Sequence, residues 1–316
     1  MNRVLRPNLD SDPILLSMLQ ATVASNRVVR IGQRKGFITG LERKPDGTYK
    51  SDVDDASELV ARPYLSRTGL TLIQEEAGLQ GEKTIEVIFH DGLDGTRAQL
   101  MGTTSSTVIC ATYDTLRNVV TRCVVGEPSF CRLWFAGEGE GLWLIHYNPD
   151  LDPDDVDGIS YLAETAERRY VWDEVVLPGK PTIITDVTPT FKQLQQLEEP
   201  ITVESLARFM YRLVIEGLDI LLPGSNGLHH ALIGHGGLGN RAAVTTALGG
   251  PWDAAPVFLA YKAGGAVLGF KNGRRIESGL AVTKGDVFIS ANSIDSANHI
   301  ETIVLESLYP DLYPLT

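Results

Sequence analysis

The chain has 316 residues, and its 40 acidic and 28 basic side chains give a formal net charge of -12 at pH 7. This acidic balance argues against nucleic acid as a partner, because nucleic-acid binding needs a basic face. No apolar run reaches the length of a membrane span, and the N-terminus lacks the apolar stretch of a signal peptide. The three cysteines have no CxxC spacing. We therefore expect a cytoplasmic protein with one large or two ordinary domains and no membrane partner.

Two helices are predicted at the start of the chain. Asp12-Pro13 precedes a stretch of apolar residues at helical spacing, which is typical of a capped helix. Lys44-Pro45-Asp46-Gly47 has the composition of a turn. Apolar pairs within residues 54–65 predict a second, short helix that ends near Gly69.

A series of apolar runs linked by short turns then predicts strands. These runs cover residues 70–74, 85–90, 106–113, 119–125, 132–135 and 142–146. Consecutive strands with short connections favour an antiparallel first half. An acidic loop follows at residues 148–157. From Pro181 on, strand-like and helix-like segments alternate, with a helix at 203–218, and this pattern is typical of an α/β second half.

The most informative segment is Asp91-Gly92-Leu93-Asp94-Gly95-Thr96, hereafter the DGLDGT motif, which directly follows the predicted strand at 85–90. It places two carboxylates three positions apart at a strand end. Hard cations such as Mg²⁺ prefer oxygen ligands and often hold phosphate substrates at the same time. A plain turn is the alternative, since Asp and Gly are favoured turn residues. In an acidic protein, bound cations would reverse the local field and allow phosphate to approach.

Further motifs accompany this segment. Leu72-Ile73-Gln74-Glu75-Glu76 is another apolar run that ends in acids, and Pro251-Trp252-Asp253-Ala254-Ala255-Pro256 places an Asp at the start of a predicted helix. Together with the DGLDGT motif, and in this order, they resemble the inositol monophosphatase family of Mg²⁺-dependent, lithium-sensitive phosphatases. Gly139-Glu140-Gly141 and the segment from Lys262 to Val267 match further parts of the family pattern. The resemblance spans residues 40 to 295.

The resemblance implies an α/β (α+β) fold, a layered α-β-α-β-α sandwich of the inositol monophosphatase and fructose-bisphosphatase type. Residues 1–181 would form a largely antiparallel half with most metal ligands. Residues 182–316 would form an α/β half that contributes Asp253 and substrate contacts. The resemblance implies two or three Mg²⁺ ions, and the ligands carried over from the family are Glu75, Asp91, the carbonyl of Leu93, Asp94 and Asp253. Asp91 is the candidate that would bridge two ions, and a pair of metal ions can stabilise both the attacking and the leaving oxygen of phosphoryl transfer.

The resemblance also assigns roles in catalysis. The Thr96 hydroxyl would pass a proton from the attacking water to a carboxylate, and the family pattern T-x-x-D-x-x-x-E matches Ser51 to Glu58 with Asp54 as that base. Asp55 is a rival one residue away, and a helix-capping role for Asp54 is an alternative that is compatible with catalysis. Gly95 and Thr96 would offer backbone N–H groups to phosphate oxygens.

Substrate contacts are expected from Gly227, Leu228 and His229, in the segment that corresponds to the family's G-S/T-A. His230 also stands where small residues are usual. Three positions differ from the family pattern. Thr246 stands where the family has an acid that contacts a sugar or inositol hydroxyl, Gly92 stands where it has a proline, and Arg97 stands where it has a smaller or polar residue. The sequence therefore predicts a Mg²⁺-dependent phosphomonoesterase for a small sugar or polyol phosphate, and a homodimer by analogy with the family.

Several alternatives remain. Within the phosphatases, the substrate could be a 3′-phosphoadenosine-type nucleotide, or a fructose bisphosphate whose second phosphate would need cations such as Arg241 and Lys262. A degenerate relative could bind metal or sugar phosphate as a non-catalytic regulator. Gly234-His235-Gly236-Gly237-Leu238-Gly239 satisfies the G-x-G-x-x-G pattern of dinucleotide-binding proteins. However, the acid at the required distance, Asp253, follows Pro251-Trp252 and not a strand-like run.

Overall fold

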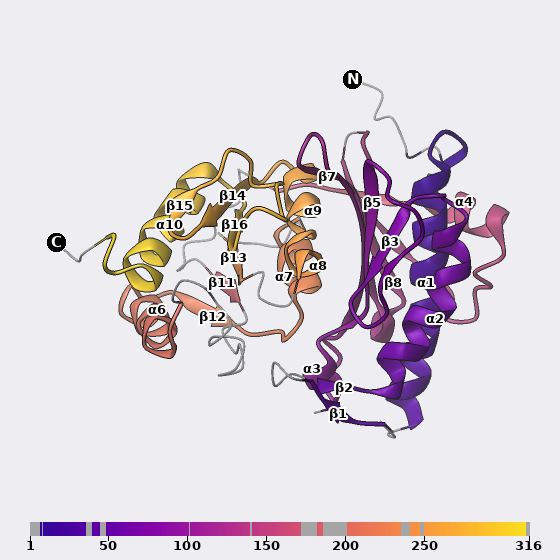
Figure 1. The fold of residues 1–316 in the computed structure, drawn as a ribbon, viewed down its shortest axis with the longest axis horizontal. Coiled ribbons are helices and arrows are strands. Elements are labelled where there is room, and N and C mark those ends of the chain that lie inside the picture. The colour runs from indigo at the N-terminus through magenta and orange to yellow at the C-terminus, as the bar shows by residue number, and fades with distance from the viewer. Residues whose placement is uncertain are drawn as a thin grey trace.

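Helices and sheets alternate in five layers across the molecule (Figure 1). The computed structural model describes residues 7, 9–35, 40–44, 49–100, 102–139, 141–171, 182–185, 201–234, 241–246 and 250–313. Pro45-Asp46-Gly47, Glu140, Asp186 and residues 235–239 of the glycine-rich motif lie outside these ranges. No helix in the described ranges is both long and apolar enough to cross a membrane.

The first layer is helical and contains the two helices that were predicted at the start of the chain. They are α1 (Pro13–Lys35) and α2 (Asp52–Ser66), and α4 (Val156–Glu164) joins them. Asp12 caps α1 by accepting a hydrogen bond from Leu15 N at 3.1 Å. Ser51 and Asp54 form a capping box, so α2 begins two residues before its predicted start. Short 3-10 helices precede α1 and β8, at Leu9–Ser11 and Pro128–Phe130.

The second layer is an eight-stranded sheet that contains every strand predicted for the first half. Its strands, in order across the sheet, are β10 (Glu167–Arg169), β9 (Leu142–His146), β8 (Arg132–Ala136), β7 (Val119–Glu127), β6 (Thr107–Asp114), β5 (Glu86–Asp94), β3 (Thr71–Gln74) and β4 (Gly78–Gln80). All neighbouring pairs are antiparallel except β3 and β5, which are parallel. A separate two-stranded pair, β1 (Glu42–Arg43) with β2 (Tyr49–Lys50), lies beside α3 (Thr96–Leu100).

Apolar side chains fill both faces of this sheet. Ile88 packs on the side of α1, and Phe89 packs on the opposite side with residues of α8 and α9. Successive strand residues point to opposite faces, and a sheet covered on both sides needs apolar residues at each position. The same alternation puts Asp91, two residues after Phe89, on the side of the middle helices.

The remaining layers come from the second half of the chain. The middle helices are α7 (Asn226–Ile233), α8 (Pro251–Ala254) and α9 (Val257–Lys262). The six-stranded sheet consists, in order, of β12 (Asp219–Leu221), β11 (Thr182–Thr185), β13 (Arg241–Thr246), β16 (Val287–Ala291), β14 (Ala266–Lys271) and β15 (Arg274–Arg275). It is parallel from β12 to β13 and antiparallel beyond. The outer helices are α6 (Val203–Ile215) and α10 (Ile294–Leu308).

The predicted α-β-α-β-α layering is therefore confirmed. The two sheets draw on separate parts of the chain, since the first ends with β10 at Arg169 and the second begins with β11 at Thr182. A division into two units at residue 181 stays a prediction.

Candidate metal centre and active site

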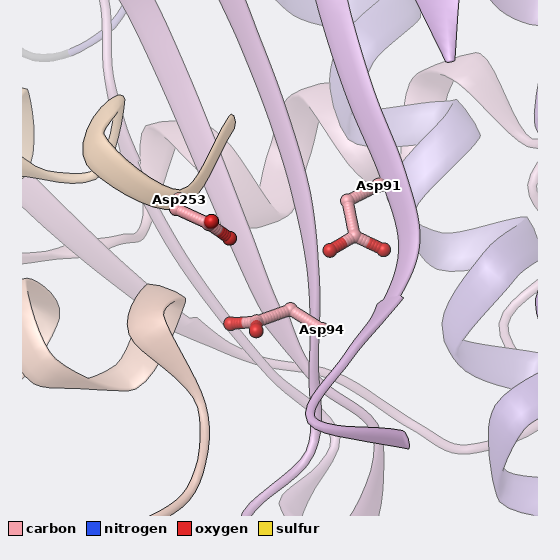
Figure 2. A group of neighbouring side chains, drawn as sticks. All are labelled: Asp91, Asp94 and Asp253. Atoms are coloured by element: carbon pink, nitrogen blue, oxygen red, sulfur yellow. The ribbon is translucent and has the colours of Figure 1, made fainter. Parts of the chain in front are cut away.

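Three buried carboxylates meet between β5 and the middle helices. Asp91, Asp94 and Asp253 each offer an oxygen, and these atoms all lie within 4.8 Å of one another. Figure 2 shows the three side chains facing a common space, with two from the end of β5 and one from α8. The structure thus brings together acids that are about 160 positions apart in the sequence.

Local backbone geometry sets the direction of each acid. The pairing of β5 with β6 is irregular between Asp91 and Asp94, so the strand departs from simple alternation there and both acids lie on the side of α8. Asp91 Oδ1 accepts a hydrogen bond from Leu93 N at 2.8 Å. Asp253 lies in the first turn of α8, where its carboxylate accepts from Gly250 N at 3.3 Å.

Asp94 links the first sheet to the second half of the chain. Its Oδ2 accepts a hydrogen bond from Gly227 N at 2.7 Å and lies 2.7 Å from Ser225 Oγ and 3.2 Å from Thr107 Oγ1. Ser225 is also the N-cap of α7. Because these groups all meet one oxygen, the other carboxylate oxygen of Asp94 is left for a different partner.

The electrostatics of the cluster suit a bound cation. Burial and the nearby charge of Glu75 raise the pKa of Asp91 well above its usual range. Burial also raises the pKa of Asp94, to about 6, against the lowering effect of its hydrogen-bond donors. Neither acid forms an ion pair with Lys or Arg in the described part of the chain. Buried acids this close repel one another unless they are protonated or bind a cation, and an all-oxygen donor set is the one that Mg²⁺ prefers.

Glu75, the remaining predicted carboxylate ligand, lies outside the three-acid cluster. Its Oε1 accepts a hydrogen bond from Lys44 Nζ at 2.7 Å, and Lys44 also pairs with Glu76. Burial lowers the pKa of Lys44, but the charges of Glu75 and Glu76 outweigh this effect, so the net shift is upward. The ammonium group of Lys44 therefore neutralises Glu75 at the edge of the site.

The predicted catalytic pair is in contact. Thr96 Oγ1 donates to Asp54 Oδ1 at 2.8 Å and lies 3.3 Å from the carbonyl oxygen of Leu93, the predicted backbone ligand. Asp54 is buried, and its Oδ2 accepts from Ser51 N at 2.9 Å as part of the capping box. Asp54 thus makes the contact that each of its two predicted roles requires, and the catalytic role stays a prediction. Asp55, the rival, is exposed and pairs with Lys50 at 2.6 Å.

The residues expected to contact the substrate make contacts within the protein. Gly95 has a φ of +88°, and a Cβ there would lie 2.6 Å from the carbonyl oxygen of Gly224, so this position needs glycine. The N–H of Gly227 serves Asp94, and that of Leu228 points to Ser225 Oγ at 3.4 Å. His229 is fully buried, with Nδ1 3.5 Å from Thr245 Oγ1. Substrate-binding roles for Gly227, Leu228 and His229 stay predictions.

Other residues of the site were not identified from the sequence. Ser225 could have been found from its place before an apolar run, since Ser is a preferred N-cap residue. Thr107 and Lys44 gave no such signal. Lys44 belongs to a predicted turn and directly follows β1, and its ion pair with Glu75 joins residues 31 positions apart in the sequence.

The sequence matches no protein-family model and no curated protein. Solved structures do resemble this one. A Thermotoga maritima IMPase superposes with a TM-score of 0.68 at 18% identity, over 93% of this chain and 97% of that chain. An inositol monophosphatase from Anabaena (Nostoc) superposes with a TM-score of 0.65 at 16% identity, over 96% of this chain and 100% of that chain. An IMPase/NADP phosphatase in complex with Mg²⁺ and phosphate superposes with a TM-score of 0.58 at 17% identity, over 86% of this chain and 88% of that chain.

These similarities extend over nearly the whole chain and define its class as a layered α/β protein. More narrowly, the chain has the fold of the inositol monophosphatases, and the resemblance inferred from the sequence motifs is confirmed at the level of the fold.

Proposed function

We propose that this protein is a Mg²⁺-dependent phosphomonoesterase that hydrolyses a small sugar or polyol phosphate. The observation that carries the proposal is the cluster of Asp91, Asp94 and Asp253 beside the hydrogen-bonded pair of Thr96 and Asp54. The three acids would hold the cations, with the carbonyl of Leu93 and the carboxylate of Glu75 as further ligands. When bound, Mg²⁺ would neutralise phosphate charge and make water a better nucleophile.

The chain itself supplies a proton path. Thr96 Oγ1 donates to Asp54 Oδ1, so the hydroxyl can take a proton from the attacking water as it gives its own to the carboxylate. Burial raises the pKa of Asp54, although hydrogen bonds from Ser51 and Thr96 oppose this effect, and a raised pKa favours acceptance of that proton. Ser51 holds Asp54 in place through the oxygen that does not meet Thr96.

Two contacts favour a substrate with one phosphate over a bisphosphate. Arg241 Nη1 donates to the carbonyl oxygen of Leu232 at 3.2 Å, where it caps the end of α7. Lys262 Nζ donates to the carbonyl oxygens of Glu138 and Gly139, at 3.0 and 2.8 Å. Both cations considered for a second phosphate thus donate hydrogen bonds to backbone carbonyl oxygens of the protein.

The test is phosphate release from a panel of esters with Mg²⁺ and with chelator. The panel contains inositol monophosphate, several sugar monophosphates, a nucleotide 3′-phosphate and fructose bisphosphate. We expect Mg²⁺-dependent release, fastest from a sugar or polyol monophosphate, and loss of nearly all release in Asp91→Asn and Asp253→Asn. Undiminished release in chelator would overturn the metal mechanism. Metal binding with no release from any ester would instead indicate a non-catalytic regulator.

The resemblance adds further expectations to this proposal. Lithium should inhibit release, titration calorimetry should count two or three Mg²⁺ per chain, and sedimentation should give the mass of a homodimer. Faster release from the nucleotide than from every sugar phosphate would favour the nucleotide alternative.

A further inference from the structure

Glu58 is a buried acid with no part in the proposed chemistry. It lies in α2, one helical turn after Asp54, and only 1% of its surface is exposed. Its Oε1 accepts a hydrogen bond from Glu76 N and its Oε2 accepts one from Ala77 N, both at 3.0 Å. These two N–H groups directly follow Glu75 in the turn between β3 and β4. The Glu58 carboxylate therefore holds the turn that contains Glu75, a predicted metal ligand.

The same part of α2 also holds the end of β5. Ser57 Oγ donates to the carbonyl oxygen of Gly92 at 2.6 Å, between the two acids of the DGLDGT motif. A Cβ on Gly92 would lie 3.0 Å from both Cγ and N of Glu58. In addition, Gln74 Nε2 at the end of β3 donates to the carbonyl oxygen of Glu58 at 3.1 Å. The ends of β3 and β5 are thus both fixed against one turn of α2.

A carboxylate is a costly group to bury fully in such a contact. Burying a charged group is costly, and a turn is closed more cheaply by a neutral side chain or by its own backbone. No Lys or Arg pairs with Glu58 among the described residues. Burial raises the pKa of Glu58, and the nearby charges of Glu76 and Glu75 add to this effect, whereas the two N–H groups of the turn oppose it. These N–H groups hold the carboxylate in place, and the carboxylate in turn fixes the residues next to Glu75.

We propose that Glu58 is a positioning residue of the metal centre, which holds Glu75 in place relative to Asp91 and Asp94 and strengthens cation binding. This inference rests on the proposed function in one respect, since it takes the acid cluster to bind a divalent cation. It does not require that the protein hydrolyse phosphate esters.

The test measures Mn²⁺ affinity by electron paramagnetic resonance in the wild type, Glu58→Ala and Glu58→Gln. We expect Glu58→Ala to weaken Mn²⁺ binding at least tenfold. Glu58→Gln keeps one acceptor oxygen without the charge, so it should recover part of the loss. Hydrogen exchange of the metal-free protein should show faster exchange at residues 75–77 in Glu58→Ala, whatever the activity.

Asp286→Asn is the matched control. Asp286 Oδ2 accepts a hydrogen bond from Asn272 N at 2.9 Å and so holds a turn at the edge of the other sheet. Its substitution should lower the thermal stability and leave Mn²⁺ affinity unchanged. Wild-type Mn²⁺ affinity in both Glu58 variants, or an equal loss in the control, would overturn the inference. Mn²⁺ binding that depends on Glu58 without any phosphate release would overturn the proposed function alone.

Discussion

At the scale of single residues, Asp54 divides its two oxygens between folding and proposed chemistry. Oδ2 closes the capping box of α2 and Oδ1 accepts from the Thr96 hydroxyl. We expect Thr96→Ala to lower the rate of phosphate release by about 100-fold or more, the usual range for loss of a proton-transfer group. Because Thr96 is not an expected side-chain ligand, Mg²⁺ affinity measured by calorimetry should change less than fivefold. Thr96→Ser should restore most of the rate, and a near-normal rate in Thr96→Ala would rule out this proton path.

Gly92 also acts at this scale, because the close approach of α2 leaves no room for a side chain. A Cβ would meet two atoms of Glu58 at 3.0 Å and the carbonyl oxygen of Asp54 at 3.1 Å. We expect Gly92→Ala to lower the free energy of unfolding in urea by about 1–3 kcal/mol, as overpacking usually does. Gly139→Ala is the control, since a Cβ at Gly139 has no neighbour within 4 Å. Equal stability of the two variants would contradict this explanation of why position 92 holds glycine.

At the scale of elements, the start of α7 connects the acid cluster to the second half of the chain. Ser225 caps this helix and lies 2.7 Å from Asp94 Oδ2. Ser225→Ala should cost about 1 kcal/mol of stability through the lost cap and should also weaken Mg²⁺ binding severalfold, because Asp94 loses an orienting partner. Ser293 caps α10 in the same way, so Ser293→Ala should give a similar stability loss with normal Mg²⁺ affinity. Similar Mg²⁺ affinities in the two variants would show that Ser225 is only a cap.

How far the elements could be predicted depended on how their residues are buried. The strands of the first sheet were predicted to within a few residues because both faces are covered and the runs are continuously apolar. In the second sheet, β12 has only three residues and β15 only two, which is too short for periodicity to act as a signal. The motifs named the three acids that the structure brings together. The ion pair of Lys44 with Glu75 could not be predicted, because it depends on tertiary packing.

At the scale of the whole molecule, a buried histidine makes stability depend on pH. His230 is fully buried, with Nδ1 2.7 Å from Ser290 Oγ, and burial followed by the charge of His229 lowers its pKa well below the usual value. The unfolded chain takes up a proton as the pH falls through about 6.5, while the folded chain does not, so this group destabilises the fold toward acid pH. His230→Asn should therefore lose less stability than the wild type between pH 7.5 and 5.0, by up to about 2 kcal/mol in urea unfolding. Equal losses would show that His230 is not buried in its neutral form.

The acid cluster also couples cation binding to the stability of the whole molecule, since it joins β5 of the first sheet to α8 between the sheets. Without a cation, close carboxylates add to the repulsion in a chain of net charge -12. Mg²⁺ that binds only the folded state should stabilise it by about 2.7 kcal/mol at 100 times its Kd, and chelator should reverse this gain. Thermal unfolding at rising MgCl₂, against NaCl of equal ionic strength, separates binding from screening. Asp253→Asn should abolish the Mg²⁺-dependent rise in Tm, because it removes the carboxylate that connects the two parts of the chain. If the variant keeps that rise, the ions act on the general surface charge and not at the cluster.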